Sequence, residues 1–435
     1  MPQAPEADVT RLRRAVPRPV RTPWRGPRSL RHPAYRRVWS AALVSFSARF
    51  IEGTVTAWVV VQNTDSPLAV TLLGFFRFLP FLFAGPFAGL ISDRLPRLRL
   101  VRATELGSAC AAVIVATLAL GGWLEVWHLY LYSLVTGTLL VLAWPARRAY
   151  MMGVVGRRNM TPALALDMLG WTISNIVASN IAGNLLRVVA PGYLYAWLAV
   201  SAMFSLALLR GLPALWRPTP AEEREPALRS LAEGFRYVRR SRLLVGAVMV
   251  VAVTNLSGFL FELVTPVFAK EVLHTGPAGL GLLISAPSFG ALAIGLLLTG
   301  LGTRVSRPGL WLLIAGIGQH VVTIAWSYAT WFPASFGALV VTGLFTFTFA
   351  TMNSNTFLAA TPDSMRGRVQ GVQIFVIGTF PVSSLLVGVL ANAIGPAPAV
   401  RWMAVGGTAA LLLIWLLFPE LRRPIEPPRE AASAA

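Results

Sequence analysis

The sequence is poor in charge, in lysine and in cysteine. Only 13% of its 435 residues are charged, whereas 55% are hydrophobic and the mean hydropathy is +0.63. A soluble globular chain averages about 25% charged residues, so this composition excludes that class and indicates a polytopic membrane protein. Cys110 is the only cysteine, which excludes an intrachain disulfide. Lys270 is the only lysine, so the basic charge is almost entirely arginine.

Acidic residues are also scarce: the chain has 38 Lys and Arg against 18 Asp and Glu, a formal net charge of +20. In a soluble protein such an excess would favour nucleic acid as a partner, but here the arginines are spread over short loops and no nucleic-acid motif occurs. The sequence also has no Cys/His cluster, no phosphate-binding glycine loop and no nucleophile–base pair. We therefore expect no metal, no cofactor, no ATP-driven pump and no enzyme.

Twelve apolar runs are long enough to cross a bilayer, because about 20 helical residues span the hydrocarbon core. Several contain proline and glycine, which membrane helices tolerate when neighbours bind the freed backbone groups. The runs predict an all-α integral membrane protein with twelve transmembrane helices in two six-helix pseudo-repeats. The expected spans are 39–62, 68–91, 100–120, 126–146, 163–186, 193–212, 243–268, 279–301, 310–328, 332–358, 369–391 and 400–418.

The charges of the loops indicate the orientation. Cytoplasmic loops of membrane proteins carry an excess of Lys and Arg. With the N-terminus inside, the expected inner loops are rich in arginine, while the outer loops hold little more than Asp65, Glu125, Lys270 and Glu271. We therefore expect both termini in the cytoplasm. The Arg-, Ala- and Gly-rich composition favours a bacterial cytoplasmic membrane.

The longest inner loop divides the chain into domains. The expected division is a disordered cytoplasmic tail at 1–34, a six-helix bundle at 35–212, a linker at 213–242, a second six-helix bundle at 243–420 and a cytoplasmic tail at 421–435.

Within the linker, apolar residues recur at helical spacing, with arginines on the other faces. These are Leu228, Leu231, Phe235 and Val238. The pattern predicts an amphipathic helix along the inner membrane surface that ties the two halves together.

A charged turn joins the second and third spans. It combines Gly89, Asp93, Arg94 and Arg97 in a Gly-x-x-x-Asp-Arg-x-x-Arg pattern, which resembles the loop between helices two and three of the major facilitator superfamily of secondary transporters. The resemblance implies that the glycine permits close helix approach and that the Asp and Arg residues lock the cytoplasmic side.

The corresponding turn of the second half repeats part of this pattern. There the basic pair is kept as Arg304 and Arg307, and Thr303 stands where the first half has an acid. Parallel six-helix repeats are the expected construction of this superfamily. We therefore expect Arg304 and Arg307 to share the gating role.

Three further stretches are similar to the subgroup that contains siderophore and macrolide exporters. They are residues 31–39 before the first span, residues 144–148 after the fourth and, as the most specific, TPDSMRGRV at 361–369 after the tenth. This resemblance implies a transporter that works by alternating access. It also implies export of a small amphipathic molecule, a drug or siderophore-like metabolite, in exchange for protons.

Charged residues inside the spans are the strongest pointers to a site, because each costs several kcal/mol in a bilayer unless it is paired or hydrated. Arg49 and Glu52 lie three residues apart on the first span and can pair, and Arg77 reaches a similar depth on the second. The three predict a cluster near the bilayer midplane, where transporter sites lie. A substrate site with proton coupling at Glu52 and a purely structural ion network are both open.

Other polar residues of the spans extend the candidate site. Glu262 is the expected proton carrier of the second half, and Asn175, Asn255 and Gln319 are candidate substrate contacts or helix-to-helix links. Glu105 and Asp167 lie about two turns from the inner ends of their helices. For these two we expect structural roles, such as pairing with Arg94 or Arg148.

The expected function is secondary active transport, with a small-molecule substrate, protons or another coupling ion, the lipid bilayer as surroundings and a monomeric state. Two alternatives stay open. One is an importer of a small organic anion that uses the same arginines. The other is a non-transporting receptor or assembly factor, which the buried charges disfavour because such a scaffold has no need of them.

Overall fold

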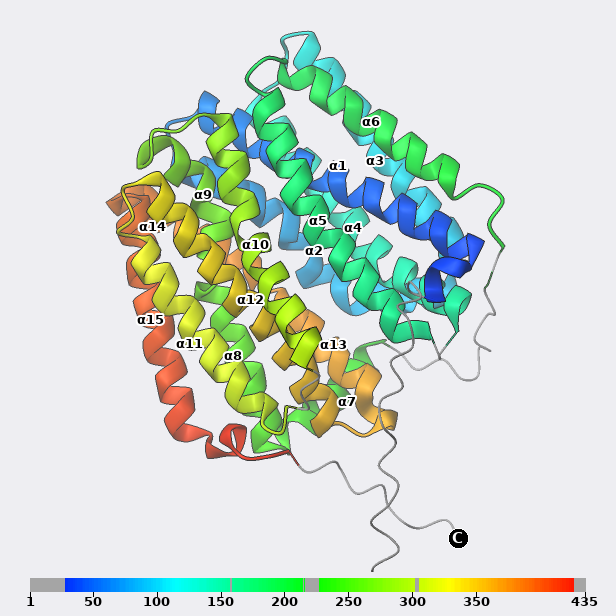
Figure 1. Cartoon of the computed structure of the whole chain (residues 1–435), viewed down its shortest axis with the longest axis vertical. Helices are drawn as coiled ribbons and strands as arrows, with labels where there is room; N and C mark the ends of the chain where they lie inside the picture. Colours follow the sequence, from blue (N-terminus) through cyan, green and yellow to red (C-terminus); the bar gives the residue numbers. More distant parts are fainter. Residues whose placement is uncertain (1–27, 157–158, 214, 216–226, 302–304, 426–435) are drawn as a thin grey trace, which may run out of the picture.

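The computed structural model describes residues 28–156, 159–213, 215, 227–301 and 305–425, and within its helices the side chains of 28, 84–94, 161, 227–228, 298–301 and 363 lie outside this description. The described residues form α-helices and short 3-10 helices with no strand, which confirms the all-α prediction. Two helical bundles lie side by side, one for each half of the chain (Figure 1).

The N-terminal bundle contains six long helices. They are α1 (Pro33–Asn63), α2 (Pro67–Arg94), α3 (Arg97–Leu120), α4 (Val126–Val155), α5 (Met160–Leu185) and α6 (Pro191–Leu208), preceded by the 3-10 helix η2 (Arg28–Arg31).

The C-terminal bundle follows after α7 (Ala227–Arg239), which occupies the part of the linker where the sequence predicts an amphipathic helix. Its helices are α8 (Arg242–Ser257), α9 (Leu260–Glu271), α10 (Pro277–Leu301), α11 (Pro308–Trp326), α12 (Phe332–Ala360), α13 (Arg366–Ile377), α14 (Phe380–Ile394) and α15 (Pro396–Leu417), with the 3-10 helices η5 (Asp363–Met365) and η6 (Pro419–Arg422).

Ten segments among the described residues have the length and hydropathy of a membrane span, counting α8 with α9 and α13 with α14 as one segment each. The other two expected spans are α2, which contributes a shorter apolar stretch over Pro67–Phe83, and α5, which is 26 residues long. The chain is therefore a multi-pass membrane protein, and the count of twelve spans stays a prediction.

Two expected spans are broken in the middle. The expected spans at 243–268 and 369–391 each coincide with one candidate membrane span, Arg242–Glu271 and Arg366–Ile394. Within them Gly258 separates α8 from α9 and Gly378 separates α13 from α14. Glycine lacks a Cβ and loses more backbone entropy in a helix than other residues, so it favours such breaks. Each break lies between two apolar segments, and hydropathy alone therefore does not reveal it.

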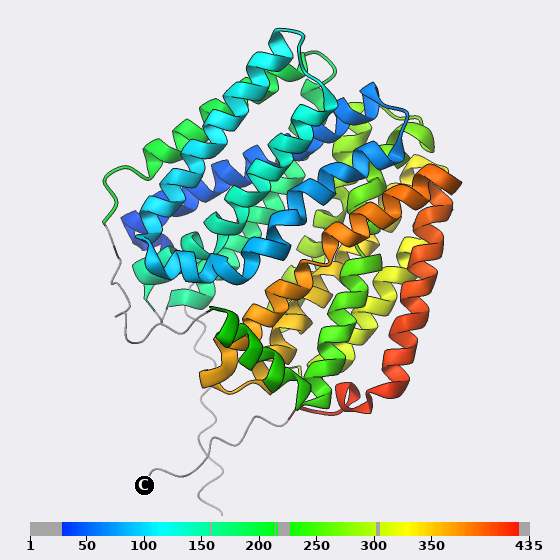
Figure 2. The same cartoon turned by 180° about the vertical axis from the view of Figure 1, so that it is seen from behind.

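The two bundles meet at one end of the molecule. We call this the far end; it carries the α1–α2, α5–α6, α9–α10 and α14–α15 connections, and the opposite end is the terminal end. At the far end the Ser66 hydroxyl donates to Asn392 Oδ1 at 3.0 Å, and Lys270 Nζ donates to the Val61 carbonyl at 2.6 Å. Toward the terminal end the axes of the bundles diverge (Figures 1 and 2).

Helices α5 and α10 form a close contact between the bundles at the far end. A Cβ on Gly183 would lie 2.4 Å from the Pro277 carbonyl oxygen, and a Cβ on Gly281 would lie 2.4 Å from the Ser179 carbonyl oxygen. Small residues let membrane helices approach this closely, because dispersion contacts replace the hydrophobic effect as the cause of association. The molecule is therefore closed at its far end.

Candidate functional site

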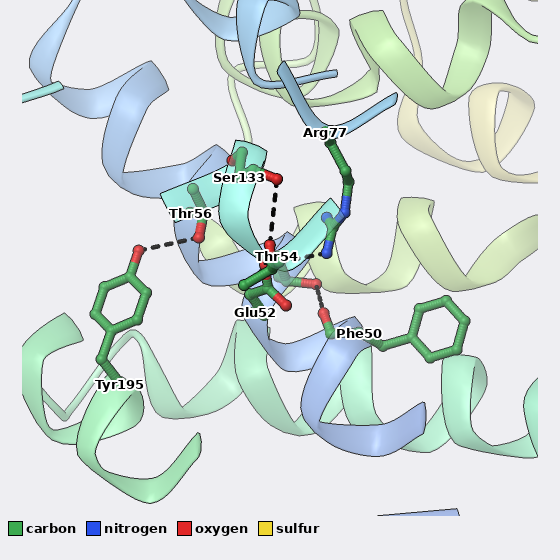
Figure 3. A network of polar contacts seen from close by, with 8 residues as sticks. Phe50, Glu52, Thr54, Thr56, Arg77, Ser133 and Tyr195 are labelled. Atoms are coloured by element: carbon green, nitrogen blue, oxygen red, sulfur yellow. Dashed lines mark hydrogen bonds and ion pairs between the residues drawn. The ribbon is translucent and has the colours of Figure 1, made fainter. Parts of the chain in front are cut away.

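Glu52 joins three helices of the N-terminal bundle. Its side chain lies in the middle of α1 and its residue is only 7% exposed. Arg77 Nη2 from α2 lies 3.1 Å from Glu52 Oε1, and the Thr136 hydroxyl from α4 donates to the same oxygen at 2.9 Å. Figure 3 shows the Arg77 side chain extending toward Glu52. A buried ion pair costs about 3–5 kcal/mol when one partner is removed, so this contact couples the three helices.

Arg49 does not pair with Glu52, although their spacing on α1 allows it. Among the described residues it forms no ion pair, and its Nη1 has no hydrogen-bond partner. Arg49 lies within electrostatic reach of Glu52 and of Arg77 without a direct contact to the carboxylate. The structure thus brings Arg49, Glu52 and Arg77 together as predicted but corrects the pairing.

A cavity of ≈ 70 Å³ adjoins this cluster inside the N-terminal bundle. It has room for about five waters, since each takes roughly 10–15 Å³. Its charged lining consists of Arg49, Glu52, Glu105 and Arg147, and its aromatic lining of Phe46, Tyr132, Trp144 and Trp171.

Glu105 lines this cavity from α3. The Ser45 hydroxyl of α1 donates to Glu105 Oε1 at 2.6 Å, and Ser45 and Ser205 of α6 lie 3.2 Å apart through their hydroxyl oxygens. Arg147 lies within electrostatic reach of Glu105, and its guanidinium covers the Phe46 ring at 4.3 Å from the centroid. The sequence predicts a structural role for Glu105, and its spacing from Glu52 does not indicate that the two acids share a cavity.

Asp167 on α5 is fully buried, and among the described residues neither of its carboxylate oxygens has a hydrogen-bond partner. It lies within electrostatic reach of Arg147 and Arg148 on α4. The predicted direct contact with Arg148 is not formed, because that guanidinium lies over the Trp144 ring at 5.4 Å from the centroid. Asp167 therefore acts on the arginines of α4 through space.

In the C-terminal bundle, two of the candidate substrate-binding residues form hydrogen bonds to backbone carbonyls at the helix breaks. Gln319 on α11 is fully buried, and its Nε2 donates to the Gly258 carbonyl at 2.9 Å. Asn255 Nδ2 reaches the Val376 carbonyl at 3.5 Å, next to the second break. The alternative left open by the sequence, that these residues link helices, is the one that these contacts favour.

Glu262 lies in the first turn of α9, just after the break. Its residue is exposed, and no hydrogen bond or ion pair to its carboxylate occurs within the described ranges. It does not line the cavity that holds Glu52. Asn175 on α5 accepts a hydrogen bond from Ser179 in its own helix at 2.9 Å. Neither of these two candidates lines the cavity that holds Glu52.

Most of the expected gate lies outside the description. Gly89, Asp93 and Arg94 belong to the end of α2, where the structure describes the backbone alone, and Arg304 is not described. Arg97 Nη1 donates to the Ala149 carbonyl at 3.3 Å, which ties α3 to α4. Arg307 directly precedes α11. The gating roles of these residues stay predictions.

A family model described as transmembrane secretion effector matches residues 25–433. The chain belongs to this family. The match covers both bundles, and it confirms the predicted membership of the major facilitator superfamily.

Curated relatives of this chain include exporters. The enterobactin exporter EntS of Citrobacter koseri is 26% identical over 403 residues, which cover 91% of this chain and 94% of that protein. The enterobactin exporter EntS of Shigella boydii is 26% identical over 409 residues, covering 92% and 96%. These relatives confirm the predicted resemblance to siderophore exporters.

Solved structures of transporters share the fold of this chain. A bacterial homologue of the human lysosomal transporter Spinster, in an inward-facing and unoccupied conformation, matches with a TM-score of 0.68 at 14% identity, covering 90% of this chain and 98% of that one. A peptide transporter, POT, in complex with sulfate matches with a TM-score of 0.71 at 12% identity, covering 88% and 94%. The protein is a transporter of the major facilitator fold and not an enzyme.

Proposed function

We propose that this transporter is a proton-coupled exporter of a siderophore-like amphipathic compound that works by alternating access. The names of the curated relatives support the direction and the substrate class, since they are enterobactin exporters matched over more than nine-tenths of the chain. The orientation follows from charge: exposed arginines such as Arg36, Arg99 and Arg240 lie at the terminal end. The terminal end, where the described chain begins at Arg28 and ends at Ile425, therefore faces the cytoplasm of a bacterial inner membrane in this proposal.

The Glu52–Arg77 ion pair is the observation that carries the proposal. It is formed in a conformation closed at the far end, and a proton on Glu52 would remove the charge that holds Arg77. In an exporter that exchanges protons for substrate, the conformation open to the cytoplasm is the one that has released its proton. The contact between Glu52 and Arg77 in this conformation fits that sequence of events.

Substrate would enter between the diverging bundles from the terminal end. Arg49 and Arg77 offer positive charge to an acidic group of the substrate, and Asn175 and Asn255 offer amides from the two bundles. Glu262, exposed and without a partner among the described residues, is the second proposed proton carrier. Asn255 and Gln319 are the weakest members of this set, because their amide N–H groups already bind the Val376 and Gly258 carbonyls.

The test is transport of enterobactin in proteoliposomes that contain a pH-sensitive dye. When a pH gradient is imposed, wild-type protein should accumulate enterobactin against its gradient and move protons in the opposite direction. This accumulation should stop when a protonophore is added. Glu52→Gln should lose this accumulation but still exchange labelled for unlabelled enterobactin. Glu125→Gln is the matched control, because it removes the same charge from an exposed loop.

Full gradient-driven accumulation by Glu52→Gln would remove Glu52 from the mechanism. Transport that is insensitive to the protonophore would refute proton coupling, and flux of other amphipathic compounds without enterobactin would refute the siderophore class.

A further inference from the structure

We propose that Glu105 is a second proton-binding site, through which the proton leaves Glu52 for the terminal end. This inference rests on the proton coupling proposed above. It starts from the cavity of the N-terminal bundle, in which Glu52 and Glu105 are the two carboxylates among the described lining residues. Neither sequence spacing nor the match to the family indicates that these residues, 53 positions apart, share one space.

The distance between the two carboxylates suits a short chain of waters. Ser45 of α1 donates to Glu105, so the Glu105 carboxylate lies at the height of Ser45 along the α1 axis. Glu52 follows Ser45 seven residues later on the same helix. Seven helical residues advance by about 10 Å, a distance that about three waters cover at ~2.8 Å per hydrogen bond. The cavity of ≈ 70 Å³ has room for about five.

A smaller cavity continues from Glu105 toward the terminal end. It measures ≈ 10 Å³, and Ser45, Glu105 and Arg147 line it as well as the larger cavity. Its other lining residues include Leu98, the second residue of α3, and Leu209, which directly follows α6. One water fits there. Glu105 thus lies between the space around Glu52 and the end that faces the cytoplasm.

The charges around the path favour a proton bound to a carboxylate over an excess proton on the waters of the cavity. Arg49 from α1 and Arg147 from α4 are the cationic groups among the described lining residues, and both repel an excess proton on water. In the exit step the Glu52 carboxyl gives its proton to the adjacent water, each water passes one proton on, and the Glu105 carboxylate accepts one. Glu52 then carries the negative charge that binds Arg77, while the summed charge of the two acids is unchanged.

The hydroxyl groups are placed to hold both ends of this path. Thr136 donates to Glu52 and Ser45 donates to Glu105, so each carboxylate keeps one hydrogen bond when it is ionised. Tyr132 and Tyr150, which line the larger and the smaller cavity, are the other titratable groups of the described lining.

The test follows protons directly and needs no substrate. Ligand-free protein reconstituted in lipid is taken by rapid mixing from acidic to neutral pH, and infrared spectroscopy follows the stretch of protonated carboxyl groups. Glu52→Gln and Glu105→Gln identify the two bands by their loss. In Glu105→Gln the loss of the Glu52 proton should slow by about 100-fold, since a positioned acid–base group accelerates proton transfer by roughly 10²–10⁴-fold.

Two variants separate this role from a structural one. Glu105→Asp keeps a carboxylate and should restore most of the rate, whereas Ser108→Ala, in the same cavity, should leave it unchanged. If Glu105→Gln does not fold, Ala42→Val keeps both acids and fills the smaller cavity, and it should slow the proton in the same way.

An unchanged Glu52 rate in Glu105→Gln or in Ala42→Val would overturn the inference while leaving proton coupling intact. If wild-type protein shows no Glu52 band at all, the proposed proton coupling fails together with it.

Discussion

Gly137→Ala should disrupt the ion pair from a position that carries no charge. Gly137 lies on α4 where it crosses α2, and a Cβ there would lie 2.1 Å from the Arg77 carbonyl oxygen. Ordinary contact begins at 3.4 Å, so the two helices must separate by about 1.3 Å. Because the obstacle is backbone, a change of rotamer cannot provide this space.

The separation of α2 from α4 disturbs the contacts of Glu52 whichever of the two helices moves. If α2 moves, Arg77 Nη2 recedes from Glu52 Oε1, and about 1.3 Å added to 3.1 Å exceeds ion-pair distance. If α4 moves, Thr136, the neighbour of Gly137, loses its 2.9 Å hydrogen bond to Glu52. Overpacking of this kind costs about 1–3 kcal/mol. We expect the free energy of unfolding to fall by that amount and gradient-driven transport to fall with it.

Thermal unfolding in detergent and the proteoliposome assay measure the two effects. Gly406→Ala on α15 is the control, because no atom beyond the adjoining residues and backbone of its own helix lies within 4 Å of the added Cβ. There the substitution should be neutral or stabilising by up to about 1 kcal/mol, as for a helical Gly→Ala change without a clash. A Gly137→Ala protein as stable as wild type, with the same proton coupling, would refute the reasoning from α2–α4 contact.

Three further changes test other parts of the structure. Glu52→Gln should lower the free energy of unfolding by about 3–5 kcal/mol, because it leaves Arg77 buried without its counter-charge. In thermal unfolding, the double variant Glu52→Gln with Arg77→Gln should recover part of that loss. Gln319→Ala should cost about 1–3 kcal/mol, because the Gly258 carbonyl at the α8–α9 break loses its donor; an equal loss of enterobactin affinity without loss of stability would instead make Gln319 a substrate contact. Gly183→Ala should weaken closure at the far end, since its Cβ would meet the Pro277 carbonyl at 2.4 Å. In a Cys110→Ser background, a cysteine introduced at Asn180 should then react faster with a thiol reagent than it does without Gly183→Ala. Equal reaction rates would contradict the assignment of this contact as the closed end.

The membrane class and most of the helices could be predicted from the sequence, because hydropathy adds up residue by residue along a span. The same holds for the cluster of Arg49, Glu52 and Arg77, whose depth follows from counting along two helices. The partner of Glu52 could not be predicted, since it depends on how α1, α2 and α4 face one another. The contact between Ser45 and Glu105 was missed for the same reason.

The break between α8 and α9 illustrates a second limit. Gly258 lies in an apolar run that reads as one continuous span, and the residues that stabilise the break come from α11, some 60 positions later in the chain. A freed carbonyl in a membrane needs a donor, and Gln319 provides it. The sequence shows the donor and the glycine, but their relationship arises only when the helices pack.

The sequence by itself thus determined that this protein spans a membrane many times, that it resembles major facilitator transporters and that charge is buried near the middle of its first two spans. Each of these properties is local or repeats along the chain. Only the tertiary structure decided which charges pair, that Glu105 shares a cavity with Glu52 and that the bundles are closed at the far end. Those features depend on distances between residues that are remote in the chain, and these are set by the packing of helix against helix.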